Sequence, residues 1–135
     1  MVIDAAMTAA WLFADEQTDA ALTVFSDVAA NGAVVPSLWR LEIANLLHTA
    51  VRRGRCDEHL ADALLEQLEC LPIVIDRETD THAWHATRAL SREHGLTPYD
   101  AAYLELAIRL GMPLASGDKE LIAAARSLGV TVLTP

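Results

Sequence analysis

Short apolar runs alternate along the whole chain with longer segments in which hydrophobic residues recur every three or four positions. The short runs hold three or four residues each and predict strands at 1–3, 33–35, 73–75, 113–116 and 130–133. The longer segments predict helices at 5–13, 15–31, 36–53, 57–71, 79–94 and 118–128, and one that begins at 97. Every strand except the last is therefore followed by at least one helix.

Strands that are short, apolar and separated by helices are typical of a parallel sheet that is covered on both faces. The 135 residues contain no internal repeat, low-complexity tract or linker-like stretch, and this length suits one domain. We therefore predict an α/β fold in which residues 1–135 form one three-layer domain with a five-stranded, mainly parallel sheet. Ligands of such sheets bind beyond the carboxyl ends of the strands, so residues at that edge are the first candidates for a site.

The helix that begins at Thr97 carries an acid on its apolar side. Thr97 suits the cap position, and the proline after it suits the first helical position. Projected on a helix, Asp100 falls on the apolar stripe, whereas Glu105 and Arg109 fall on the opposite side at the spacing of a solvated ion pair. The pattern therefore predicts that Asp100 faces the interior and Glu105 faces water.

Three further acids belong to the same edge of the predicted sheet. Asp4 ends the first strand, Asp118 follows the fourth strand, and Glu42 lies among leucine and isoleucine residues early in the helix after the second strand. Each has an ordinary explanation, since Asp4, Asp100 and Asp118 suit helix capping and Glu42 could form a surface ion pair. Separate structural explanations for four acids at one edge are less satisfactory, because crowded carboxylates raise one another's pKa or require a cation.

Composition and charge limit the function classes. The net charge of −9 argues against a broad basic nucleic-acid-binding face, although a bound metal ion could still attract phosphate. No apolar run is long enough to cross a membrane. An acid close to the N-terminus does not suit a signal peptide, and Cys56 and Cys70 form no metal or redox motif. These features favour a cytoplasmic protein with reduced thiols.

Other conspicuous residues favour structural explanations. The five histidines lack the spacing of a zinc site, and the basic cluster at 52–55 stands where a helix ends at a glycine. Trp39 shares an apolar helix side and is expected to pack inside, whereas Trp84 lies among polar residues and is expected to be partly exposed. The chain has no glycine-rich phosphate loop and no nucleophilic serine elbow.

Four segments together resemble the PIN-domain family, and more narrowly the VapC-type toxins of type II toxin–antitoxin systems. These segments are 2–5, 35–45, 96–103 and 114–119. The resemblance implies an endoribonuclease that depends on Mg²⁺ or Mn²⁺, acts on an RNA substrate, forms a homodimer and is neutralised by a cognate antitoxin. It also implies that the metal ligands are Asp4, Glu42, Asp100 and Asp118, with Ser116 and Thr97 as supporting catalytic residues.

One departure from the family pattern leaves an alternative open. Members of the family commonly have Ser or Asn two residues after the first aspartate, where this chain has Ala6. The alternative is a non-catalytic RNA- or protein-binding module of the same fold. A third hypothesis, a phospho-acceptor or phosphatase, needs a lysine from a nearby strand, whereas Lys119 is expected on a helix.

Overall fold

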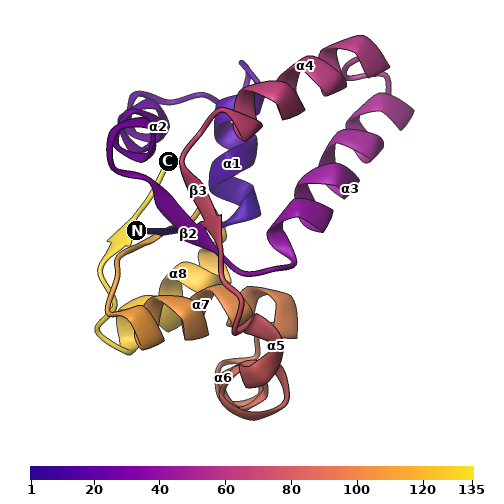
Figure 1. The fold of residues 1–135 in the computed structure, drawn as a ribbon. Helices are drawn as coiled ribbons and strands as arrows, with labels where there is room; N and C mark the ends of the chain where they lie inside the picture. Colours follow the sequence, from indigo (N-terminus) through magenta and orange to yellow (C-terminus); the bar gives the residue numbers. More distant parts are fainter.

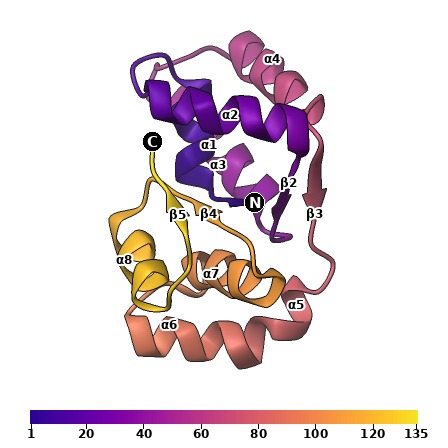
Figure 2. The same cartoon turned by 90° about the vertical axis from the view of Figure 1, so that its left-hand side faces the viewer.

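The computed structural model describes residues 1–135 and contains one sheet of five parallel strands in the order β3-β2-β1-β4-β5. The strands are β1 (Val2–Ile3), β2 (Ala33–Val35), β3 (Ile73–Ile75), β4 (Leu114–Ala115) and β5 (Val132–Leu133). Figures 1 and 2 show helices α1 to α4 on one side of the sheet and α5 to α8 on the other. The predicted three-layer α/β fold is confirmed, and the sheet is parallel throughout.

The central strand is short and completely buried. Both residues of β1 have no exposed surface, and Val2 lies opposite Val34 on one side and Leu114 on the other. A strand covered on both faces must be apolar at every position, which explains why these segments appear as continuous hydrophobic runs. The carboxyl ends of β1 and β4 therefore meet at one edge of the sheet.

The helices begin at caps that the sequence supplies locally. Five of them start after an Asp or Thr whose side chain accepts a backbone N–H three residues ahead: Asp4, Thr18, Asp57, Thr97 and Asp118. The helices are α1 (Ala5–Leu12), α2 (Asp19–Asn31), α3 (Trp39–Arg52), α4 (Glu58–Glu69), α5 (Thr79–His82), α6 (Arg88–His94), α7 (Pro98–Leu110) and α8 (Lys119–Ser127). A π-helical turn, Ala83–Thr87, joins α5 to α6, so the predicted helix at 79–94 is continuous but irregular.

Several predicted element boundaries differ from the structure. Helix α2 begins at Asp19 instead of residue 15, since Thr18 accepts the N–H of Ala21 and fixes the start there. Asp15 and Glu16 lie before the helix and pair with Arg55 at 2.7 and 2.8 Å. Helix α3 begins at Trp39 instead of residue 36, and β1, β4 and β5 are shorter than predicted, with two residues each.

Helix α7 contradicts the predicted exposure of its two acids. Glu105 is only 5% exposed, whereas Asp100 is half-buried near the start of the helix. All residues from 101 to 107 are buried, because α7 packs between the sheet and the segment formed by α5, the π-helical turn and α6. The expected ion pair of Glu105 with Arg109 exists, at 2.7 Å, but it is covered by this second layer of helices instead of being solvated. A helix covered on two sides has no fully solvated face.

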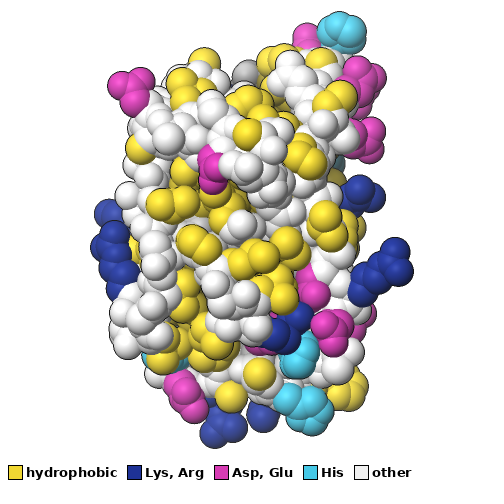
Figure 3. All heavy atoms as spheres, turned by 60° about the vertical axis from the view of Figure 1, so that its left-hand side comes forward, with side chains coloured by type: hydrophobic (Ala, Val, Ile, Leu, Met, Phe, Trp, Pro, Cys, Tyr) yellow, Lys and Arg dark blue, Asp and Glu magenta, His cyan; other side chains and the backbone are white.

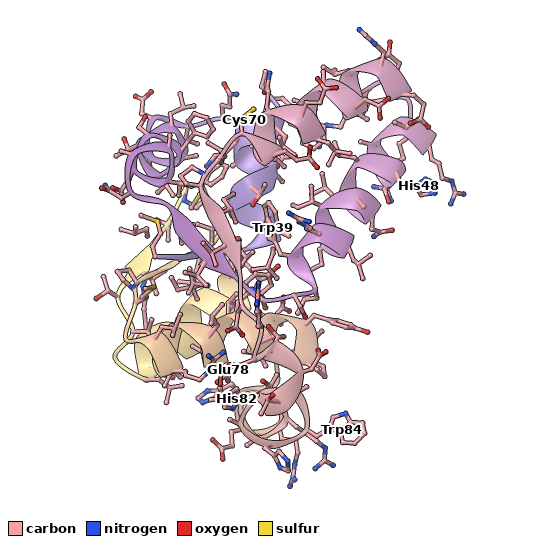
Figure 4. All side chains as sticks on the ribbon, in the orientation of Figure 1. Trp39, His48, Cys70, Glu78, His82 and Trp84 are labelled. Atoms are coloured by element: carbon pink, nitrogen blue, oxygen red, sulfur yellow. The ribbon has the colours of Figure 1, made fainter.

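The tryptophans lie as predicted. Trp39 is 5% exposed, and its indole N–H donates to the hydroxyl of Thr8 at 3.1 Å. Trp84 is 85% exposed and projects from the π-helical turn away from the body of the molecule (Figure 4). No helix combines the length and the apolar character that a bilayer crossing requires. On the face drawn in Figure 3, Lys and Arg side chains are scattered toward the periphery and form no broad basic patch.

Candidate functional site

Asp4 occupies the edge where β1 ends and is 3% exposed. Its backbone N–H donates to the carbonyl of Ala115 at 3.1 Å, so the residue is fixed against β4. One carboxylate oxygen accepts the N–H of Met7 at 2.6 Å and caps α1, and the other accepts the hydroxyl of Ser116. The capping explanation for Asp4 is therefore correct, but it uses only one of the two oxygens.

Ser116 links Asp4 to the loop after β4. Its hydroxyl has no exposed surface, donates to Asp4 and accepts the backbone N–H of Asp118 at 3.0 Å. Asp118 is half-buried, and one of its oxygens accepts the N–H of Leu121 at 2.7 Å to cap α8. Two acids from opposite ends of the chain are thus held together through one buried serine.

The third and fourth acids come from α7 and α3. Thr97 caps the helix by accepting the backbone N–H of Asp100 at 3.1 Å, and its hydroxyl donates to the Asp100 carboxylate at 2.8 Å. Glu42 lies half-buried in the first turn of α3 and accepts the hydroxyl of Tyr103. The Tyr103 ring is 1% exposed, so this bond reaches from the interior of α7 to the other helical layer.

The electrostatics show that the four carboxylates share one region. Burial raises the pKa of the Asp4 carboxyl to about 6, because lost hydration outweighs the hydrogen bonds from Ser116 and Met7, and repulsion from Asp118 and Asp100 adds to the rise. Burial likewise raises the pKa of Glu42, against the Tyr103 hydrogen bond and with repulsion from Asp100 and Asp4. The pKa of the Tyr103 hydroxyl lies above its ordinary range, because of burial and the adjacent Glu42.

None of the four acids takes part in an ion pair. Every ion pair in the structure involves Arg55, His82 or Arg109, and none includes one of the four acids. The acids also do not form a closed cluster, since no three His, Cys, Asp or Glu side chains stand in ready metal-binding arrangement. The region is an open set of carboxylates without ion-pair partners.

All six predicted site residues lie at this edge, and one further residue, Tyr103, was not predicted. The helical projection placed Tyr103 on the apolar stripe beside Asp100, which is correct, but no signal in the sequence links it to Glu42, 61 positions away. Ala6, the departure from the family pattern, lies at the same edge, because a Cβ atom added to Gly117 would come within 3.3 Å of its side chain.

Comparison with known proteins identifies the family. The model of the PIN domain matches residues 1–127. The chain belongs to the PIN-domain family. It is similar to ribonuclease VapC3 of Pyrobaculum aerophilum, with 31% identity over 121 residues that cover 90% of this chain and 91% of the relative. It is also 34% identical over 93 residues to ribonuclease VapC1 of Mycobacterium tuberculosis, covering 66% of this chain and 65% of that protein. These matches support the narrower VapC-type assignment.

Solved structures share the fold of this PIN-domain protein. The crystal structure of PAE2754 from Pyrobaculum aerophilum matches with a TM-score of 0.70 at 24% identity, over 98% of this chain and 82% of that one. FitAcB from Neisseria gonorrhoeae matches with a TM-score of 0.62 at 14% identity, over 98% of this chain and 96% of that one. Sequence identity this low establishes a common fold and nothing more.

Proposed function

We propose that this protein is a divalent-metal-dependent endoribonuclease of the VapC toxin type. The observation that carries the proposal is the convergence at a sheet edge of four carboxylates from different elements, none of which forms an ion pair. The names of the relatives, which are ribonucleases, support RNA as the substrate class.

The residues present fit a hard divalent cation. Asp4, Glu42, Asp100 and Asp118 offer carboxylate oxygens, which Mg²⁺ and Mn²⁺ prefer over nitrogen or sulfur ligands. The raised pKa of Asp4 shows the free-energy cost of leaving this carboxylate buried and ionised without a counter-charge. When bound, such an ion supplies an acidified water nucleophile and charge stabilisation for phosphodiester hydrolysis.

Ser116 and Thr97 support the site by orienting its carboxylates. Ser116 fixes the second oxygen of Asp4 and the backbone of Asp118 through one hydroxyl. Thr97 holds Asp100 through a reciprocal pair of hydrogen bonds. Groups of this kind keep the ligands of a metal in position before the ion binds. Catalysis by this site therefore needs no basic side chain, in agreement with the net charge of −9.

The same charge suits neutralisation by an antitoxin. A basic segment of a partner protein would be attracted by the acid-rich chain and would compete with the cation at the carboxylates. We therefore include a cognate antitoxin with a basic segment in the proposed function. A homodimer remains a prediction from the family resemblance.

The test is cleavage of a mixed RNA pool by the purified protein, with Mg²⁺ or Mn²⁺ and with a chelator. The variant Asp100→Asn keeps the shape of the side chain and the backbone N–H that the Thr97 cap accepts, but it removes the negative charge. We expect metal-dependent cleavage by the wild type and a loss of at least about 100-fold in the variant. Asp62→Asn, an exposed acid of α4, is the matched control and should keep full activity.

Two outcomes would contradict the proposal. Cleavage that survives both the chelator and Asp100→Asn would point to another nuclease in the preparation. Tight metal binding without cleavage of any RNA would favour the non-catalytic module, for which Ala6 is the sequence argument. The phospho-acceptor hypothesis is disfavoured, because Lys119 lies exposed in the first turn of α8.

A further inference from the structure

Tyr103 places a hydroxyl group in the buried part of α7, which otherwise holds apolar residues and Glu105. The residues around it on α7, from 101 to 107, are all buried, and its ring is 1% exposed. A buried phenol needs a hydrogen-bond partner, because an unpaired hydroxyl in the interior costs free energy. The partner is a carboxylate of the candidate site, Glu42, instead of a backbone carbonyl of α7 or of the sheet.

Glu42 depends on this contact more than the other acids depend on theirs. Asp4 and Asp118 each accept a backbone N–H at the start of a helix, and Asp100 is held by Thr97 next to it in the chain. Glu42 has the longest side chain of the four, and Tyr103 is its only side-chain hydrogen-bond partner. Without that hydroxyl, nothing else shown in the structure would keep the carboxylate turned toward the sheet edge.

The bond also joins the two helical layers. Glu42 comes from α3, which lies on one side of the sheet, and Tyr103 comes from α7 on the other (Figures 1 and 2). Only one carboxylate oxygen, Oε2, accepts the phenol, so Oε1 keeps its lone pairs for another ligand. A carboxylate that is held through one oxygen keeps its other oxygen available to a metal ion.

We propose that Tyr103 is the positioning residue of Glu42: its hydroxyl holds the carboxylate at the sheet edge, ready for a divalent cation. The inference rests on the proposed function, because it assumes that the four carboxylates bind the metal. It adds a residue that does not touch the metal or the RNA and acts only through Glu42.

The test compares Mn²⁺ affinity in the wild type and four variants by calorimetry without RNA. Tyr103→Phe keeps the ring in the core and removes the hydroxyl, and we expect its Kd for Mn²⁺ to rise about 10-fold. Glu42→Gln should weaken binding at least as much. The double variant should bind no more weakly than Glu42→Gln alone, because the hydroxyl acts only through the carboxylate. Tyr99→Phe, which removes the hydroxyl of a 64% exposed tyrosine on the same helix, is the control and should bind as the wild type does.

The outcomes separate this inference from the proposed function. If the wild type binds no Mn²⁺, the proposed function fails and the inference fails with it. If the wild type binds Mn²⁺ but Tyr103→Phe binds equally well, or the losses in the double variant add, only the positioning role is overturned. A crystal structure of the Mn²⁺-loaded wild type is a test that does not depend on folding of the variant. A Tyr103–Glu42 hydrogen bond beside the ion supports the role, and a Glu42 turned away from Tyr103 overturns it.

Discussion

The candidate site and the cluster around Arg109 both gather acids from distant parts of the chain, but only the second contains a cation. Arg109 lies 2.7 Å from Glu105, 2.8 Å from Asp76 and 3.4 Å from Glu78. Figure 4 shows Glu78 and His82 where β3 leads into α5, the segment that this cluster fastens over α7. The Glu105 and Asp76 contacts hold the pKa of Arg109 above its usual range, so it stays charged.

The two clusters shift the pKa of an aspartate in opposite directions. Burial alone would raise the pKa of Asp76, but hydrogen bonds from Arg109 and Thr79 outweigh burial and lower it. At Asp4 burial dominates and neighbouring acids add to it, so the pKa rises to about 6. Asp76 has an arginine partner and is less deeply buried, whereas Asp4 has no cationic partner and has acidic neighbours. The chain supplies the cation of the Arg109 cluster itself, whereas none of the four acids of the candidate site forms an ion pair.

The largest expected effect is a gain of stability with a loss of activity in Asp4→Asn. The folded-state pKa of Asp4 is raised, so the folded protein loses stability as pH rises from 3.8 through about 6 and remains less stable above it. Asparagine can still accept the N–H of Met7 but carries no charge. In chelator at pH 7.5 we expect unfolding free energy to increase by about 2 kcal/mol, and cleavage to fall at least about 100-fold.

Urea unfolding and an RNA cleavage assay on the same preparations measure both effects. A less stable Asp4→Asn would show that the capping role of this residue outweighs its charge. An active variant would remove Asp4 from the metal site.

The second effect is a loss of stability in Arg109→Met, which leaves Asp76 and Glu105 without their cation. Because Arg109 is 18% exposed and water can partly replace it, we expect a loss of about 2 to 3 kcal/mol, at the low end for a buried ion pair. Arg55→Met is the matched control, since Arg55 pairs with exposed acids and should cost much less. Unfolding in urea measures both, and equal losses would contradict the contrast.

The smallest effect is a difference in acid sensitivity. The pKa of Asp76 is lowered on folding, so its contribution is present above its unfolded pKa of 3.8 and is lost as pH falls through the lower folded value. Asp76→Asn should therefore flatten the fall of stability below pH 4. The contribution of Asp4 to stability has the opposite sign. As pH rises from 3.8 to about 6, ionisation of the buried Asp4 carboxyl lowers the stability of the folded protein. Urea midpoints from pH 3 to 7 measure both slopes, and parallel curves for wild type and Asp76→Asn would refute the first.

Much of the site followed from local chemistry. Thr97 and Asp118 are predicted as caps, and each accepts the expected N–H, because a cap depends on four neighbouring residues. Glycines that end helices are equally local, as Gly32 and Gly95 show with φ of 79° and 67°. The convergence of the acids followed from the predicted parallel sheet, because the carboxyl ends of parallel strands lie at one edge.

The sequence by itself determined the strands, most helix starts and the set of acids, because these depend on apolar runs and on contacts a few residues apart. Only the tertiary structure decided which acids receive a cation. Arg109 meets Asp76 33 positions away, and Tyr103 meets Glu42 61 positions away. Glu105 is buried because another helical segment covers it, which no periodicity within α7 records. Contacts between distant segments depend on how layers pack, and one helix's pattern contains no information about its neighbour.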